Sequence, residues 1–392
     1  MTVMEEQLTS RSVEMVVTET AIAGGLALAS FIGNALVLLS VLLNARLRKQ
    51  QYLYIANYAF IDLLVACAVL PLSIYALAFG SWPVGATICT LQGHVVMVLP
   101  AITNITMAIS AVDRAFATSK PISHATFFTR RYTSILITLC WLVVLALPAS
   151  FFINNRKFVF HPGYALCKTD EGYMDTGTVE FFYAVVPFII TGISYVNIKI
   201  GLRKNAHALV KMRHHAQWEF LSSWRAEDAV TALYAALAIA VLLCALPGYA
   251  FNAALGSRIF FDPVTLPRSL YLAGTYALAL GSAVKPMIIV SKDKDFAAAL
   301  RRILRCSKRS SAKVGDIPRI YGGAESVLQS DCGAGVRQFL SAYGGTERAE
   351  PCGRSTRASS GRKNGWAEHE EVNEEGNEGG NKEVNEEENE GE

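Results

Sequence analysis

Seven long apolar segments dominate the first 290 residues of this chain and constrain its fold more than any other feature. A bilayer core about 30 Å thick is crossed by a helix of about 20 mostly apolar residues. Charges are rare inside the segments, with Asp62 in the second and Lys285 in the seventh. The segments predict an all-α membrane protein, a bundle of seven transmembrane helices over residues 20–291. They cover residues 21–43, 53–80, 88–112, 133–152, 179–198, 229–251 and 270–290.

Basic residues gather in alternate loops and predict the orientation of the bundle. Loops rich in Lys and Arg stay in the cytoplasm. We therefore expect an extracellular N-terminus over residues 1–19, a cytoplasmic C-terminus and a place in the plasma membrane. The short basic runs fit membrane orientation better than binding to nucleic acid. They include Arg46, Arg48, Lys49, Lys120, Arg130, Arg131, Arg203, Lys204, Lys211, Arg213 and Arg225.

The chain continues beyond the seventh segment with two parts of different character. Residues 292–306 place Phe296, Leu300 and Leu304 at helical spacing among basic residues, which predicts a short amphipathic eighth helix on the inner leaflet. Cys306 at its end is a candidate for palmitoylation, or else a plain free cysteine. Residues 307–392 are rich in Ser, Gly, Asn and Glu, so we expect a disordered acidic tail. Its Ser and Thr residues are either phosphorylation sites for receptor kinases and arrestin or part of a solvated tail.

Landmark residues inside the segments fall in a characteristic order. They are Gly33, Asn34, Asp62, Cys89, Asp113, Arg114, Trp141, Cys167, Pro187, Tyr195, Cys244, Pro247, Pro286 and Phe296. This order resembles the rhodopsin-like (class A) G-protein-coupled receptors, above all in the 25 residues from Cys89 to Arg114. The resemblance covers about residues 20–306. It implies a receptor, not an enzyme, that transduces an extracellular ligand to heterotrimeric G proteins by outward movement of helix six.

The resemblance also assigns roles to residues at both ends of the bundle. It implies a disulfide between Cys89 and Cys167 on the extracellular side. Asp113 and Arg114 would form a cytoplasmic switch, with Arg114 bridged to Glu227 on helix six in the inactive state. Tyr195 on helix five belongs to the same switch. The alternative is that the Asp113–Arg114 pair only anchors helix three at the membrane edge.

Polar residues deep in the membrane are functional candidates, because burying them in lipid is costly. Asn34 and Asp62 are the first two. In the family the acid on helix two often binds a sodium ion, and Thr103 and Ser282 occupy positions that could contribute oxygens. The alternative is a satisfied polar network that fixes the packing of the helices.

Three motifs depart from the family pattern. Asp-Arg-Tyr reads Asp113-Arg114-Ala115, Cys-Trp-x-Pro reads Cys244-Ala245-Leu246-Pro247, and Asn-Pro-x-x-Tyr reads Lys285-Pro286-Met287-Ile288-Ile289. A lone ammonium inside the membrane needs a partner, so we expect a Lys285–Asp62 ion pair to stand in for the sodium ion. The alternative is that Lys285 extends along its own helix to the inner surface. These departures leave open constitutive activity or another route of activation.

The outer halves of the helices predict a mostly neutral ligand pocket. In amine receptors an acid lies seven residues after the helix-three cysteine, and here that position is Val96. The position of the retinal lysine of opsins is Ala279. We therefore expect a non-amine small molecule, a lipid or a peptide as ligand. The pocket candidates are Gln92, His94, Val96, Met97, Tyr183, Tyr249, Asn252 and Thr275.

Other function classes find less support in the sequence. A transporter would show inverted repeats and more intramembrane charges, and a membrane enzyme would show a catalytic motif. The eight cysteines form no CxxC pair, so we expect no metal and no cofactor. A non-signalling scaffold of receptor descent stays open because motifs of helices six and seven are lost.

Overall fold

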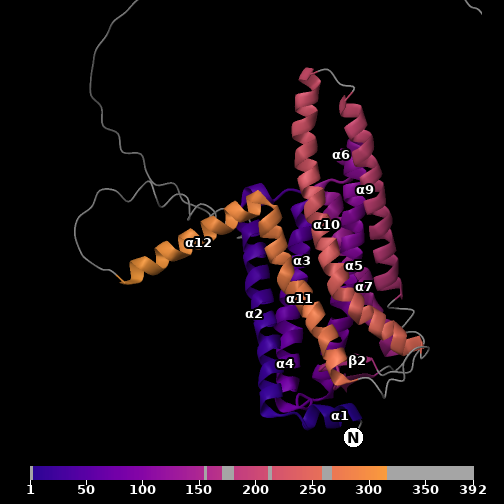
Figure 1. The fold of residues 1–392 in the computed structure, drawn as a ribbon, viewed down its shortest axis with the longest axis vertical. Coiled ribbons are helices and arrows are strands. Elements are labelled where there is room, and N and C mark those ends of the chain that lie inside the picture. The colour runs from indigo at the N-terminus through magenta and orange to yellow at the C-terminus, as the bar shows by residue number, and fades with distance from the viewer. Residues whose placement is uncertain (1–2, 154–156, 170–180, 211–213, 258–266, 316–392) are drawn as a thin grey trace, which may run out of the picture. The chain divides into compact units, whose positions relative to one another are not determined.

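A bundle of long helices makes up most of the molecule (Figure 1). The computed structural model describes residues 3–153, 157–169, 181–210, 214–257 and 267–315, without the side chains of 3, 147–153, 181, 205–210, 214–227, 250–257 and 306–315. The long helices are α2 (Val13–Leu43), α3 (Tyr52–Leu64), α4 (Leu70–Phe79), α5 (Ala86–Ser119), α7 (Arg130–Ile153), α9 (Val186–Val210), α10 (His214–Ser257) and α11 (Arg268–Lys292). Shorter elements are η1 (Ala45–Leu47), α6 (Pro121–Phe127) and the π-helical segments η2 (Val65–Val69) and η3 (Phe181–Val185).

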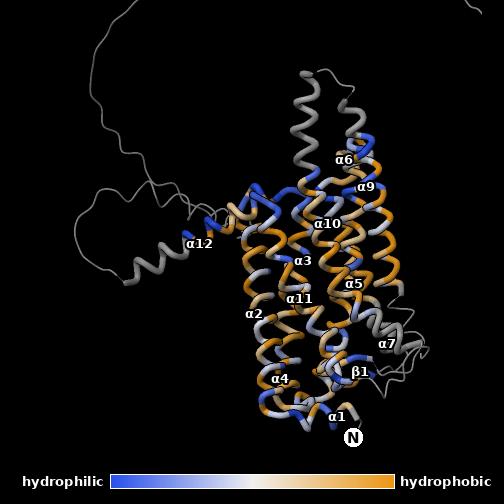
Figure 2. The backbone as a smooth tube through the Cα atoms, viewed as in Figure 1, coloured by the Kyte–Doolittle hydropathy of each residue, from blue (hydrophilic) through white to orange (hydrophobic). Residues whose placement is uncertain are grey.

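The predicted seven-helix membrane bundle is confirmed. Within the described ranges, six helices are long and apolar enough to cross a membrane, and the bent pair α6–α7 brings the number to seven. The segment η2 joins α3 and α4 into one span, so the predicted span over 53–80 is a helix with one π-helical turn. Apolar residues colour the length of the bundle in Figure 2, and hydrophilic residues gather toward its ends.

Apolar side chains cover the outside of the bundle as well as its core. Leu142 on α7, Ile193 on α9 and Leu243 on α10 are each more than half exposed. Exposing so many apolar side chains is unfavourable in water, whereas contact with lipid tails is not. Inside, Gly33 on α2 allows the close approach of α11, because a Cβ there would lie 2.8 Å from Pro286 Cγ.

A two-stranded hairpin and a short helix close one end of the bundle, here called the hairpin end. Strands β1 (Phe158–His161) and β2 (Leu166–Thr169) are antiparallel, with Phe160 opposite Cys167. The predicted disulfide is present: Cys167 is joined to Cys89 on α5, with S–S 2.04 Å. Gly93 makes room for the hairpin, since a Cβ there would lie 2.0 Å from the Phe158 ring.

The short helix is α1 (Val3–Thr9), in the segment that sequence analysis treated only as an extracellular terminus. Its Leu8 is 2% exposed. Arg11 bridges Glu19 on α2 at 2.5 Å, Glu19 also pairs with Arg268 on α11, and Gln7 Oε1 accepts the Arg268 N–H at 3.1 Å. Thus α1 is fastened over the ends of α2 and α11.

The opposite end, here called the α12 end, carries the amphipathic helix α12 (Lys294–Gly315). Asp293 caps α12 with its side chain, which accepts the N–H groups of Asp295 and Phe296 at 2.8 and 3.1 Å. Phe296 is 1% exposed and packs edge-on against Tyr52, with ring centroids 5.3 Å apart. The amphipathic helix is therefore anchored to the bundle by an apolar side chain, a contact that was not predicted from its spacing.

Candidate functional site

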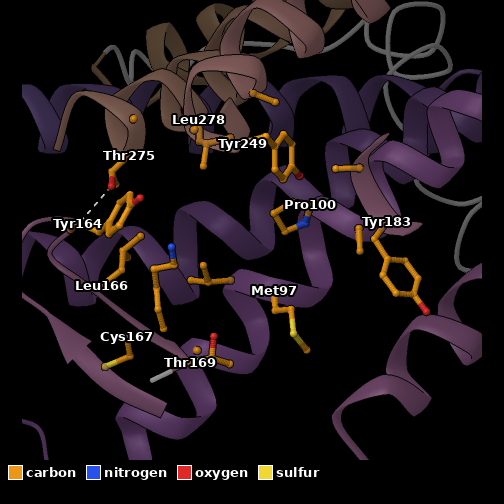
Figure 3. A pocket seen from close by; sticks show the side chains of 18 of the residues that line it. Met97, Pro100, Tyr164, Leu166, Cys167, Thr169, Tyr183, Tyr249, Thr275 and Leu278 are labelled. Atoms are coloured by element: carbon orange, nitrogen blue, oxygen red, sulfur yellow. Dashed lines mark hydrogen bonds between the residues drawn. The ribbon is translucent and has the colours of Figure 1, made fainter. Parts of the chain in front are cut away.

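An outer cavity of about 140 Å³ lies under the hairpin, between α5, η3, α10 and α11. Figure 3 shows ten labelled residues of its lining, which come from these helices and from the hairpin. Thr275 Oγ1 donates to the Tyr164 carbonyl at 3.0 Å and ties α11 to the hairpin. Lys168 is the charged side chain in the lining, and its Nζ lies 4.1 Å from the centre of the Tyr164 ring. The described lining holds no carboxylate.

An inner cavity of about 110 Å³ lies deeper, between α3, η2, α5, α10 and α11. Asp62 and Lys285 line it, 3% and 5% exposed. Lys285 Nζ donates to Asp62 Oδ1 at 2.8 Å, and Asp62 Oδ2 makes no hydrogen bond with the described residues. Thus the ammonium of Lys285 turns into the bundle rather than along its own helix.

The two cavities meet at Ala245. They share the lining residues Val96, Pro100, Leu166, Ala245, Tyr249, Thr275 and Leu278. Ala245 is 5% exposed and occupies the position at which the receptor pattern has a large aromatic ring. Because the alanine side chain ends at Cβ, no ring from this position separates the outer cavity from the inner one.

The other polar residues of the interior form short hydrogen-bonded chains. Asn34 Nδ2 donates to the Ser30 carbonyl at 2.9 Å and to the Ser282 carbonyl at 3.1 Å, and the hydroxyls of Ser30 and Ser282 lie 2.7 Å apart. Thr103 lines the inner cavity, but its hydroxyl donates to the Leu99 carbonyl of its own helix at 3.0 Å. Asn34 and Ser282 therefore join α2 to α11, as a packing network does.

A second polar network ties the middle of the bundle together. Trp141 Nε1 on α7 donates to Asn57 Oδ1 on α3 at 2.9 Å, and Asn57 Nδ2 donates to Thr106 Oγ1 on α5 at 3.0 Å. Asn104 Nδ2 donates to the Tyr249 hydroxyl at 2.9 Å and so joins α5 to α10. Each bond crosses between two helices and adds a polar contact to their mostly apolar packing.

An α12-end cluster surrounds Arg114, and we define it as Gln50, Asp113, Arg114, His124 and Tyr234. Asp113 is fully buried and accepts three hydrogen bonds: from Arg114 Nη2 at 2.8 Å, from His124 Nε2 at 2.6 Å and from Gln50 Nε2 at 3.1 Å. His124 belongs to α6, so the carboxylate fixes the segment between α5 and α7 against the bundle.

Tyr234 brings α10 into the α12-end cluster. Its ring centre lies 5.9 Å from the Arg114 guanidinium carbon, and its hydroxyl donates to the Gln51 carbonyl ahead of α3. The Tyr54 ring packs edge-on against it at 6.2 Å between centroids. Arg114 itself is 1% exposed, so its side chain is closed to solvent. Tyr195 on α9 is partly buried and packs against the neighbouring apolar core.

The pocket residues predicted from the sequence separate into two groups. Val96, Met97, Tyr183, Tyr249 and Thr275 line the outer cavity. The prediction for Gln92 and His94 is corrected, because neither lines either cavity.

Both of these side chains serve the structure at the hairpin end. Gln92 Oε1 accepts the Cys167 N–H at 2.9 Å, and its Nε2 donates to the Val69 carbonyl at 3.2 Å. His94 Nδ1 lies 2.6 Å from the Thr90 carbonyl, and its ring packs on Phe158. Three further predictions, the side chains of Glu227, Asn252 and Cys306, lie outside the described residues.

Part of the α12-end cluster could not be predicted from the sequence. Gln50 and His124 lie outside the apolar segments, so no periodicity points to them. Tyr234 had a signal, because it follows Glu227 by seven residues, which is about two helical turns and the same face of α10.

Comparison with known proteins decides the family. The model of the family described as "7 transmembrane receptor (rhodopsin family)" matches residues 33–288. This chain belongs to that family. It is therefore a multi-pass membrane protein and a receptor rather than an enzyme.

Individual relatives of this rhodopsin-family receptor are distant. The human alpha-1D adrenergic receptor is 24% identical over 366 residues, which is 81% of this chain and 63% of that receptor. The histamine H2 receptor of Canis lupus familiaris is 24% identical over 307 residues, 75% of this chain and 81% of that receptor. The Danio rerio melatonin receptor type 1B-B is 28% identical over 172 residues, 43% of this chain and 48% of that receptor. Thus the chain spans less than two thirds of the human alpha-1D receptor.

Proposed function

We propose that this protein transduces an extracellular ligand to heterotrimeric G proteins from the plasma membrane. Membership of the rhodopsin family is the observation that carries the proposal. The basic loops support an orientation with the hairpin end outside and the α12 end in the cytoplasm. Ligand would then bind in the outer cavity, and a G protein would bind at the Arg114 end of the same helices.

The contacts of Arg114 support outward movement of helix six as the activating step. Here α10 is held at the cytoplasmic end by Tyr234, which contacts Arg114 and donates to the Gln51 carbonyl. Moving α10 outward would break both contacts and expose the buried guanidinium to a partner helix. That is a two-state element which a ligand at the far end can bias. In this proposal Asp113, Arg114 and Tyr195 form the switch, with Glu227 as a further partner of Arg114.

The chemistry of the outer cavity argues against a cationic ligand. The adrenergic and histamine receptors among the relatives are named for amines. A protonated amine needs a buried acid as partner. In this chain the acid position on helix three is Val96, and Asp62 in the inner cavity already pairs with Lys285. We therefore favour a neutral small molecule or a lipid.

The Lys285–Asp62 pair supports a receptor that does not use sodium. An ammonium 2.8 Å from the carboxylate supplies the positive charge that a sodium ion would otherwise bring. Basal nucleotide exchange should therefore be the same in sodium and in choline buffers, and Lys285→Asn should introduce a sodium dependence. Strong sodium dependence in the unaltered receptor would refute this role of Lys285.

Nucleotide exchange on purified G proteins tests the proposal as a whole. We expect exchange above the receptor-free rate with at least one G-protein class, in the basal state or after a screen of apolar ligands. Arg114→Ala should reduce it to the receptor-free rate. Arg131→Ala, an equal charge change at an exposed position at the start of α7, should leave it intact. No exchange with any G protein would favour the receptor-like scaffold.

The C-terminal segment adds partners to the proposal. The alternation of basic and apolar residues in α12 supports contact with membrane lipid, and Cys306 would add a palmitoyl anchor. Phosphorylated Ser and Thr residues of the tail would recruit arrestin after receptor kinases act. Mass spectrometry of the receptor from stimulated cells tests both modifications.

A further inference from the structure

The outer and inner cavities adjoin and share part of their lining, and together, here called the chamber, they end on a buried ion pair. Val96, Ala245 and Thr275 line both cavities. From Thr275 to Lys285 the chamber follows ten residues of α11, which is about 15 Å of helix. The lining over this depth is predominantly apolar, and its two charged groups, Asp62 and Lys285, lie at the far end.

The far end of the chamber has an incomplete set of hydrogen bonds. Asp62 is 3% exposed, and its Oδ2 makes no hydrogen bond with the described residues, although Oδ1 accepts from Lys285 at 2.8 Å. The Ser282 hydroxyl lines the same cavity, lies 2.7 Å from Ser30 Oγ and interacts with the Asp62 carboxylate, without a hydrogen bond to its Oδ2. A buried carboxylate oxygen without a donor is costly, so this position is built to receive a donor.

The charges at the far end restrict what the donor can be. A ligand ammonium would be repelled by Lys285, and a ligand carboxylate would be repelled by Asp62. A hydroxyl meets both demands, because it donates one hydrogen bond and accepts others. The hydroxyl can donate a hydrogen bond to Asp62 Oδ2 and accept one from a Lys285 N–H group.

We propose that one elongated molecule, with an uncharged apolar body and a terminal hydroxyl, occupies both cavities and binds the Lys285–Asp62 pair through that hydroxyl. The proposal rests on the proposed receptor function, since the bound molecule would act as its ligand. Binding of the molecule can be tested without any signalling. A body of roughly a dozen carbon atoms spans the chamber, given bond lengths near 1.5 Å. Ala245 is the residue that admits it, since a large ring there would divide the chamber.

Thermal unfolding of the purified full-length receptor in lipid nanodiscs tests the proposal with 1-dodecanol and n-dodecane as probes. We expect 1-dodecanol to raise the unfolding temperature with a half-maximal concentration roughly tenfold below that of n-dodecane, because only the alcohol completes the bonds of Asp62. Equal behaviour of the two probes, or no effect of either, would overturn the proposal. No G protein is present, so a failure of signalling in the exchange assay leaves this result unaffected.

Two variants locate the alcohol. Ala245→Trp should weaken the effect of 1-dodecanol at least tenfold, whereas Leu246→Trp adds the same ring to a side chain that is 51% exposed and should change nothing. The double variant Asp62→Leu with Lys285→Met replaces the pair by apolar groups without leaving a lone charge. It should fold and bind alcohol and alkane equally. An alcohol effect that survives Ala245→Trp would mean binding outside the chamber.

Discussion

Lys285 and Asp62 each depend on the other for their charge inside the bundle. Lys285→Ala leaves a buried carboxylate without its cation, which costs about 3–5 kcal/mol for a buried pair. We expect a marked fall in the temperature of thermal unfolding, measured by tryptophan fluorescence in detergent. Lys292→Ala removes the same charge from an exposed position at the end of α11 and should have little effect. An equal fall in both variants would contradict a structural role for the pair.

At the scale of single residues, the sequence predicted contacts that depend on type and position along a helix. The partner of Lys285 could be predicted because a lone intramembrane ammonium has few acids to choose from, and Asp62 is the one acid well inside the spans. Gln92 was misassigned because periodicity gives the face of a helix but not what the side chain bonds. Its amide is engaged by the backbone of Cys167 and Val69, which no sequence pattern encodes.

Among the elements, α10 is the one that moves in the proposed mechanism, and the Tyr234 hydroxyl restrains it. Tyr234→Phe removes the hydrogen bond to the Gln51 carbonyl and keeps the ring beside Arg114. A net hydrogen bond contributes about 1 kcal/mol, so we expect basal nucleotide exchange to rise about fivefold. Tyr276→Phe makes the same change at the hairpin end, where the hydroxyl donates to the Glu19 carbonyl, and serves as the control. Unchanged basal exchange in Tyr234→Phe would remove this restraint from the mechanism.

The N-terminal helix α1 is held over the hairpin end by charge as well as by packing. Glu19→Ala leaves Arg11 and Arg268 without their shared acid, and Arg268 is 5% exposed. We expect a lower unfolding temperature and faster protease cleavage ahead of α2, followed by mass spectrometry. Glu14→Ala changes an exposed acid of α2, the helix that carries Glu19, and this variant should behave like the unaltered protein. Equal cleavage rates would mean that the ion pairs of Glu19 do not hold α1 in place.

Element boundaries were harder to predict than element positions. The apolar part of helix six covers residues 229–251, whereas α10 runs from His214 to Ser257. Apolar length reports only the part of a helix that lies in lipid, and polar turns continue beyond it. Helix α1 was missed for a related reason, because seven residues with two acids carry too short a pattern to separate a helix from a loop.

At the scale of the whole molecule, the bundle could be predicted because lipid permits few alternatives: a spanning segment must satisfy its own backbone, and a helix does so. The arrangement of the cavities could not, since it depends on which small residue, such as Ala245, meets which neighbour in space. The orientation of the bundle can also be predicted from the sequence, but only from the charges of the loops, because no contact inside the bundle determines it.

The loop charges predict the orientation of the bundle in its membrane. The bases between α2 and α3, beyond α5 and in α12 should all lie in the cytoplasm, because short basic loops are retained there. An epitope placed before Val3 should bind antibody on intact cells, and one placed after Glu392 should bind only after permeabilisation. Reversing the charge bias with Arg46→Glu, Arg48→Glu and Lys49→Glu should reduce the fraction of surface-labelled chains, whereas Lys308→Glu in α12, far from the first span, should not. Labelling of the C-terminal epitope on intact cells would mean that the bundle has the inverted orientation, with the outer cavity facing the cytoplasm. That result would refute reception of an extracellular ligand.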